Sequence, residues 1–321
     1  MTAGVQPSPA PLRYAYNTNG LANHRLGDAL DLLGESGYDG VALTLDVSHL
    51  DPFGADLARE TLRVQSRLSR LGLGCVIETG ARFLLDPRAK HEPTLVSPDA
   101  DARARRVDFL VRAARVGAAL GAEAVSFWAG VPRAGVDRVE ARRWLVEGVR
   151  AVLEQTAGLG VDLAFEPEPG MLVETCAEWA ELAADVAGAG HGDAGGDTAG
   201  AGLRLALDTG HCLANGEGEP QDMVHRHADR LGTVAVEGMA RGVHEHLPLD
   251  EGDMDLPAVL GALRAVGYRR LVCVELSRDS HRADRMVGRA LATLRGAEAQ
   301  GGAGTPSEAA PTEEVPCASA S

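Results

Sequence analysis

The chain lacks a cluster of basic residues that would bind a polyanion. Asp and Glu number 46 against 31 Lys and Arg in 321 residues, which gives a formal net charge of −15. Such a charge repels DNA and anionic membrane surfaces unless a local basic patch intervenes. The arginines are instead spread along predicted helices that also carry Asp and Glu. We therefore expect neither nucleic acid nor a membrane among its partners.

The chain also lacks paired cysteines, a signal sequence and a membrane span. Its five cysteines contain no CxxC pair and are odd in number, which favours a reducing compartment over a disulfide framework. The N-terminus has no basic segment followed by an apolar run, and no apolar run approaches the length of a membrane span. These absences predict a soluble, cytoplasmic protein.

What the sequence does contain is a repeated alternation of short apolar strands and amphipathic helices, in a composition that is 45% hydrophobic and 24% charged. The predicted strands lie within residues 12–19, 40–46, 74–80, 123–130, 161–170, 203–212, 231–238 and 270–277. This alternation favours a single (β/α)8 TIM barrel over residues 12–296. A doubly wound sheet is the alternative, and it is disfavoured because no GxGxxG turn follows the first strand.

Three segments are expected to contribute nothing to the barrel. They are a flexible leader at residues 1–11, a Gly-, Ala- and Asp-rich insertion at 187–202 and a disordered tail at 297–321. The long segment 81–99 after the third strand is different, because a loop of this length inside a compact domain is usually functional.

Four of the predicted strands end in a carboxylate. The stretch LRLALDTGHC alternates apolar residues and then places Asp208 and His211 just past the strand, separated only by Thr209 and Gly210 in what we predict to be a tight loop. The other three strand-end carboxylates are Glu78, Glu166 and Glu275. In a barrel all four lie on the same C-terminal rim, where active sites are found. A helix cap or a surface position is the alternative for each residue alone, but the repetition favours a site.

Several other residues near the predicted rim have two plausible interpretations. His244 and His246 alternate in an extended loop, so both can point the same way into a site or into solvent. Glu168 follows Glu166 in a proline-rich turn, either positioned at the site or exposed. Arg82 can hold a phosphate or carboxylate of a substrate or form a salt bridge with a neighbouring acid. Trp128 can floor a sugar pocket or belong to the core.

The ordered series FEPEPG, DTGH, HEHLPLDEGDMD and VELS resembles the xylose-isomerase-like barrel superfamily, and within it the sugar phosphate isomerases/epimerases, over roughly residues 12–294. The resemblance implies a divalent metal on the rim with Glu166, Asp208 and Glu275 as carboxylate ligands. It also implies that Glu166 and Glu275 form an acid/base pair. His211 matches a histidine that contacts the substrate or ligates a further metal. Arg241 matches a position that binds substrate oxygens in ketose 3-epimerases.

The sequence departs from that family pattern in one place. Relatives usually end the seventh strand on a histidine ligand in a pattern like HxHxxD, whereas this chain has Ala235 and Gly238 at the corresponding positions. Three consequences remain open: the metal is held more weakly, it recruits His246 or Glu237, or it is absent. Carboxylate oxygens suit Mg²⁺ or Mn²⁺, and added imidazoles bring Zn²⁺, Co²⁺ and Fe²⁺ into range.

Three functions are compatible with these features. The first is a metal-dependent isomerase or epimerase that moves a proton through an enediolate of a small sugar or sugar phosphate. The second is a metal-depleted barrel that binds a metabolite or a protein partner without catalysis. The third is a zinc-dependent phosphodiester hydrolase, which predicts additional histidine ligands after the second and third strands and a basic rim that faces DNA. It is disfavoured by the negative charge and by the strand ends TLDVSHL and ETG. A homo-oligomer is compatible with any of them.

Overall fold

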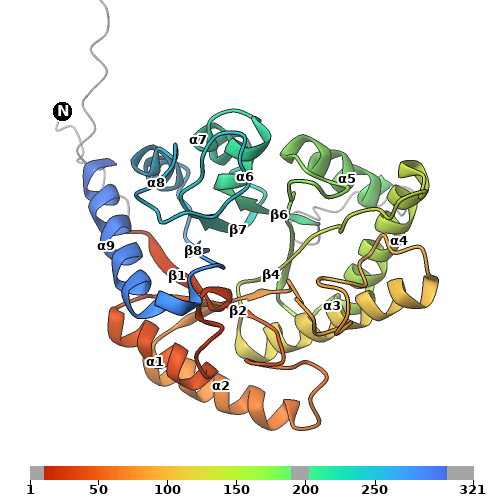
Figure 1. Ribbon diagram of the computed structural model, residues 1–321, viewed down its shortest axis with the longest axis horizontal. Helices are drawn as coiled ribbons and strands as arrows, with labels where there is room; N and C mark the ends of the chain where they lie inside the picture. The colour runs from red at the N-terminus through yellow and green to blue at the C-terminus, as the bar shows by residue number, and fades with distance from the viewer. Residues whose placement is uncertain (1–10, 189–201, 302–321) are drawn as a thin grey trace, which may run out of the picture.

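Eight parallel strands close into one barrel in chain order in the computed structural model, which describes residues 11–188 and 202–301 (Figure 1). The strands are β1 (Arg13–Asn17), β2 (Gly40–Thr44), β3 (Gly74–Glu78), β4 (Ala124–Phe127), β5 (Asp162–Phe165), β6 (Arg204–Asp208), β7 (Leu231–Val236) and β8 (Leu271–Val274). The predicted (β/α)8 TIM barrel is therefore confirmed, and the doubly wound sheet is not the fold.

The helices form an outer ring around these strands (Figure 1). They are α1 (Leu26–Ser36), α2 (Leu57–Leu71), α3 (Ala100–Leu120), α4 (Arg138–Thr156), α5 (Cys176–Gly188), α6 (Thr209–Asn215), α7 (Pro220–Arg226), α8 (Leu256–Ala265) and α9 (Ala283–Gly301). Gly121 ends α3 in the left-handed conformation, with φ of 70°, as its position in the sequence predicts. No helix within the described residues is long and apolar enough to cross a membrane.

Three predicted boundaries were wrong. Helix α5 continues to Gly188, so residues 187 and 188 belong to it rather than to the insertion. The stretch after Asp208 is not a loop, because α6 begins at Thr209 and the Asp208 carboxylate caps it by accepting a hydrogen bond from the backbone N–H of His211. Helix α9 continues to Gly301, so residues 297–301 belong to it rather than to a disordered tail. Its apolar side continues with Ala297, which is buried. The rest of that tail, 302–321, lies outside the described residues, as do 1–10 of the predicted leader and 189–201 of the predicted insertion.

The barrel interior is filled with small residues. Two clusters of buried side chains are separate from the large core between strands and helices: one contains Ala15, Ala42, Val76, Leu271 and Cys273, and the other contains Ala124, Ala164 and Ala206. Because side chains alternate between the two faces of a strand, the residue two positions further along also faces the barrel axis. The residues packed inside the barrel therefore determine which side chains at the C-terminal ends of the strands face the barrel axis.

Candidate functional site

The inward-facing residues at or next to the C-terminal ends of the strands are almost all polar. In strand order they are Asn17, Thr44, Glu78, Ser126, Glu166, Asp208, Ala235 and Glu275. Ala235 of β7 is the one apolar member of this ring, and it pairs in register with Asp208 on one side and Cys273 on the other. The ring brings together the four strand-end carboxylates named by sequence, and it leaves β7 without a polar group at this position.

A cavity of about 530 Å³ opens above the ring. Nine of the residues singled out from sequence line it: Glu78, Arg82, Trp128, Glu166, Glu168, His211, His244, His246 and Glu275. Asp208 is only 3% exposed and does not line the cavity, but its carboxylate meets those of Glu166 and Glu275, with one oxygen from each within 4.8 Å of the others. This arrangement fits a cation bound by all three carboxylates. Among the described residues, no positively charged side chain in the ring balances their charge.

The carboxylates are held by few hydrogen bonds. Asn19 donates from Nδ2 to Oε1 of Glu275 at 2.8 Å, and Ser126 donates from Oγ to Oε2 of Glu166 at 3.3 Å. Burial, reinforced by the neighbouring carboxylates, raises the pKa of Glu166 well above its ordinary value. Burial and the charge of Glu275 likewise raise the pKa of Glu78. Without a cation, these two groups therefore favour their protonated forms.

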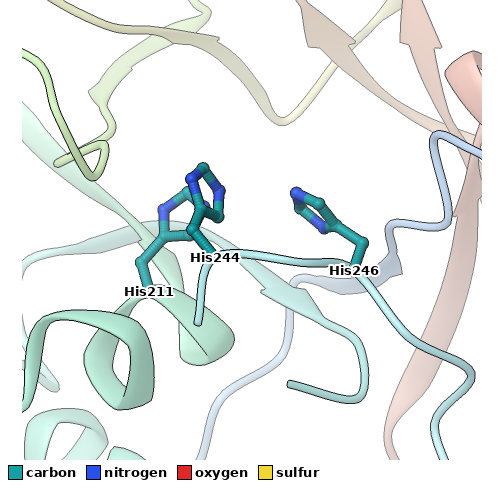
Figure 2. Close-up of side chains that lie close together, drawn as sticks. All are labelled: His211, His244 and His246. Atoms are coloured by element: carbon teal, nitrogen blue, oxygen red, sulfur yellow. The ribbon is translucent and has the colours of Figure 1, made fainter. Parts of the chain in front are cut away.

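Three histidines meet on the β6–β7 side of the cavity (Figure 2). His211 comes from α6, whereas His244 and His246 come from the extended loop after β7. The centroid of the His211 ring lies 4.8 Å from that of the His244 ring and 6.1 Å from that of the His246 ring. In Figure 2 the ring of His244 overlaps that of His211, to which it is nearly perpendicular, and the ring of His246 lies across a gap from them. The two loop histidines thus face the site rather than solvent alone.

The hydrogen bonding of His211 defines its tautomer. Its Nδ1 lies 3.0 Å from the carbonyl oxygen of Pro167, which only accepts, so Nδ1 carries the proton in the neutral ring. Burial lowers the pKa of His211, which favours that neutral form. Its Nε2 is then a free lone pair, buried without a partner, 3.7 Å from Oδ2 of Asp208 and 3.8 Å from Oε2 of Glu168. A lone pair facing two carboxylates requires a proton or a cation between them.

The histidine loop is held in place by Gly238. Gly238 and Leu247 exchange two backbone hydrogen bonds, of 2.9 and 2.7 Å, which fold the loop back on the end of β7. A Cβ at position 238 would lie 2.1 Å from the carbonyl oxygen of Pro248 and 2.3 Å from that of Glu251. The acidic residue that relatives carry at this position therefore has no space in this chain, because the returning loop occupies it.

The variant Gly238→Ala is expected to lose stability and to displace the histidine loop. Two carbonyl oxygens must move to admit the methyl group, and overpacking of this kind costs about 1–3 kcal/mol. Thermal unfolding with and without Mn²⁺ measures both effects. A lower melting temperature reports the loss of stability, and a smaller increase in melting temperature on adding Mn²⁺ reports the displaced loop. Gly261→Ala is the control, since no atom lies within 4 Å of a Cβ placed there. A Gly238→Ala protein as stable and as metal-responsive as the parent would contradict this account of the loop.

The structure places two of the side chains with open interpretations: Arg82 lines the cavity without the alternative salt bridge, whereas Trp128 belongs to both the cavity wall and the core. Arg82 lines the cavity and donates from Nη2 to the carbonyl oxygen of Asn19 at 2.8 Å, with no ion pair to an acid within the described residues. Trp128 lines the cavity but is largely buried, with 7% of it exposed, and Cζ of the Arg106 guanidinium lies 4.3 Å from the centroid of its ring. Both side chains can thus contact a ligand in the cavity, while Asn19 holds Arg82 in place and Arg106 packs against Trp128.

Arg241 is not brought to the cavity. Its side chain is 52% exposed and pairs with Glu219 at 2.7 Å, and its backbone N–H donates to Asp253. The loop after β7 turns outward at this point, so the substrate-binding role implied for Arg241 by family position has no support in the geometry.

Other cavity residues were missed from sequence. Asn19, Lys90 and Arg278 line the cavity from the segments after β1, β3 and β8. No motif marked them, although Lys90 lies in the segment 81–99 that was predicted to be functional. Glu237 was noted only as a substitute ligand, yet it is fully buried directly after β7. A signal for Glu237 was present, since it lies two residues after Ala235 and so continues the inward-facing positions of its strand.

Comparison with known proteins identifies a family and several solved structures of similar fold. A family model described as xylose isomerase-like TIM barrel matches residues 30–297. A D-allulose 3-epimerase from Methylomonas sp., solved in complex with D-allulose, is 20% identical with a TM-score of 0.67, covering 90% of this chain and 98% of that chain. A 3-keto-D-glucoside 4-epimerase from E. coli is 17% identical with a TM-score of 0.67, covering 89% and 99%. A probable 3-DHS dehydratase from Bacillus anthracis is also 17% identical with a TM-score of 0.67, covering 88% and 99%. Curated proteins gave no match. At these identities the likeness to solved structures shows the fold alone.

Proposed function

The chain belongs to the xylose isomerase-like TIM barrel family, and from this we propose that it is a divalent-metal-dependent isomerase or epimerase of a small polyhydroxylated carbonyl compound. The observation that carries the proposal is the convergence of Glu166, Asp208 and Glu275, with an oxygen of each within 4.8 Å of the others at one end of a closed barrel. Packing alone gives no reason to gather three acids in a buried ring.

The donor atoms at this point suit a divalent cation. Oδ2 of Asp208 and Nε2 of His211 are both buried without a hydrogen-bond partner. Glu166, Asp208 and Glu275 would hold the ion, with His211 and His246 as imidazole donors nearby, a set that fits Mn²⁺, Co²⁺ or Zn²⁺. When bound, such an ion polarises carbonyl and hydroxyl oxygens of the substrate and so acidifies the adjacent C–H.

Glu166 and Glu275 are proposed to remove and return the proton at the reacting carbon. They come from β5 and β8, which are not neighbours in the barrel, so the two carboxylates, although within 4.8 Å of each other, approach a bound substrate from different directions. Burial raises the pKa of Glu166, which suits a group that must both hold and release a proton near neutral pH. The amide of Asn19 orients Glu275. One carboxylate takes the proton from the carbon beside the carbonyl, which leaves an enediolate, and the other gives a proton back. Return to the opposite face of the same carbon epimerises the substrate, whereas return to the former carbonyl carbon, with the hydroxyl proton passing between the two oxygens, isomerises it.

The remaining lining residues are proposed to hold the substrate. His211 and His244 can bind hydroxyl groups, and Glu168, within 3.8 Å of a nitrogen of each, orients them. Glu78 can accept from a hydroxyl on the opposite side, and the ring of Trp128 offers a flat apolar surface of the kind that packs against a sugar C–H face.

The mouth of the cavity supports an anionic group on the substrate. Arg82, Lys90 and Arg278 line it, and Lys90 has no ion pair among the residues that the structure describes. For a sugar phosphate, Lys90→Met is expected to raise KM about tenfold, equivalent to about 1.4 kcal/mol, with kcat little changed because the group lies away from the reacting carbon. The same variant acting on the unphosphorylated sugar should keep its KM. Equal effects on both sugars would contradict an anion-binding role.

The function is tested by proton exchange as well as by product formation. Metal-stripped protein is reloaded with Mn²⁺, Co²⁺ or Zn²⁺ and incubated in D₂O with a panel of ketoses, aldoses and their phosphates. NMR should show deuterium at the carbon beside the carbonyl, together with the isomer or epimer. Metal binding without exchange on any substrate would overturn the isomerase. An absence of both metal binding and exchange would favour a barrel that binds a metabolite or a partner without catalysis.

A further inference from the structure

His91 lines the cavity from the long segment after β3, and the proposed mechanism gives it no role. Its backbone φ is 67°, in the left-handed region that residues other than glycine rarely adopt. The backbone N–H of His91 donates to the carbonyl oxygen of Arg82, which closes the intervening residues into a compact loop. Backbone strain of this kind is found where the surrounding structure fixes a functional side chain, and here that side chain reaches the cavity.

Two contacts fix the orientation of the His91 ring. Its Nδ1 lies 2.6 Å from the carbonyl oxygen of Gly80, and its ring forms a T-shaped contact with Trp128, with the ring centroids 5.6 Å apart and the planes at 90°. Trp128 in turn packs against the guanidinium of Arg106, which is fully buried. The imidazole is therefore held at a defined angle to the flat ring that is proposed to pack against a sugar.

The contact with Gly80 also fixes the tautomer of His91. A carbonyl oxygen only accepts, so Nδ1 carries the proton in the neutral ring and Nε2 keeps a lone pair. Burial lowers the pKa of His91, and the positive charges of Lys90, Arg106 and Arg82 lower it further, which favours the neutral ring. Nε2 forms no hydrogen bond within the described residues and the side chain is half-buried, so the lone pair can accept from a ligand.

We propose that His91 is a specificity residue whose Nε2 accepts a hydrogen bond from one hydroxyl group of the substrate, an inference that rests on the proposed function for its polyhydroxylated ligand. The basic side chains of the same segment, Arg82 and Lys90, can only donate. A hydroxyl group can donate to Nε2 and accept from such a side chain, whereas an ionised phosphate or carboxylate has no proton to donate and meets the lone pair with its own. His91 therefore selects a hydroxyl group over an anionic group at the place beside Trp128.

The test measures the coupling between His91 and single hydroxyl groups. Isothermal titration calorimetry gives the Kd of ketoses, aldoses and their monodeoxy analogues for the Mn²⁺-loaded parent and for His91→Asn. Asn tolerates the left-handed backbone but is too short to place an acceptor where Nε2 lies. The variant should bind the intact sugar about 5–10-fold more weakly and should bind unchanged the one analogue that lacks the hydroxyl group bound by His91. Analogues that lack another hydroxyl group should show the same loss as the intact sugar.

Two further variants and a spectroscopic signal complete the test. His225→Asn is the matched control, because His225 is an exposed residue of α7, and it should bind every sugar as the parent does. His91→Phe keeps a ring beside Trp128 without an acceptor and gives the answer if His91→Asn does not fold. In ¹⁵N NMR of the parent, the signal of the unprotonated Nε2 of His91 should shift on addition of sugar. A role limited to shaping the cavity wall predicts no such shift.

The outcomes separate this inference from the proposed function. Coupling between His91 and one hydroxyl group without deuterium exchange overturns the isomerase and leaves the role of His91 intact. Exchange together with an equal loss for the intact sugar and every analogue overturns the role of His91 and leaves the isomerase. Absence of binding of any sugar in the panel overturns both.

Discussion

Glu275→Gln is expected to lower kcat by about 10²–10⁴-fold while leaving the fold intact. Gln has the size of Glu and its amide oxygen can still accept the hydrogen bond from Asn19, but it can neither take nor return a proton at the reacting carbon. The measurements are kcat for the substrate found in the exchange panel, deuterium incorporation in D₂O and the melting temperature. The first two should fall together and the third should change little.

Metal content separates the two roles assigned to Glu275. If Glu275→Gln still binds metal but no longer exchanges the proton, the loss lies in proton transfer, whereas parallel loss of metal would identify Glu275 chiefly as a ligand. Glu35→Gln, a change in an exposed residue of α1, serves as the control and should match the parent chain in all measurements. Activity of Glu275→Gln within a factor of about two of the parent would remove Glu275 from the mechanism.

Strand pattern predicted the barrel because each strand carries its own signal. Short apolar runs with turn residues on both sides define strands locally, and the eight of them close in chain order. The start of α6 was missed because Thr209 and Gly210 read as turn residues, although Asp208 before them is a helix cap. The end of α9 was placed too early, since small residues after Leu294 give a weak apolar pattern in sequence.

The candidate site was predictable to the extent that it follows strand register. Glu78, Glu166, Asp208 and Glu275 share one facing direction because each lies two residues beyond a small interior residue. The position of Arg241 was not predictable in this way, because it depends on where a loop turns. The loop path is set by tertiary contacts, such as the carbonyl groups packed against Gly238, and these have no local signature.

The burial of His246 and Glu237 is a tertiary effect of the same kind. His246 faces inward only because Leu247 pairs with Gly238, and Glu237 is enclosed only because Gly210 leaves room for it. Neither relation links neighbours in sequence. Pattern analysis therefore identified the acids at the strand ends and noted Glu237 and His246 as substitutes, without showing that they meet.

The buried carboxyl groups should make stability depend on pH in opposite ways with and without metal. In the metal-free protein, burial raises the pKa of Glu78, Glu166 and Glu237 well above the ordinary value of 4.5. A carboxyl group whose pKa is higher in the folded state binds its proton more tightly there. Its stabilising contribution is therefore complete below about pH 4.5 and is lost as the pH rises through the raised value.

A bound cation reverses that trend, because it requires these carboxylates in their ionised form and competes with protons for them. The gain in melting temperature from saturating Mn²⁺ should therefore grow steadily from pH 5 to pH 8. In chelator these carboxyl groups withdraw stability over the same range, whereas the buried His211 and His244, whose pKa values burial lowers, add stability as the pH rises through their ordinary value of 6.5. Melts at four pH values in each condition measure both slopes. In Glu237→Gln one of the raised groups is missing, so less stability should be withdrawn from the metal-free protein. A metal effect that is equal at pH 5 and pH 8 would mean that the buried acids are not the groups that bind the ion, and the proton-transfer roles of Glu166 and Glu275 would then lose their physical basis.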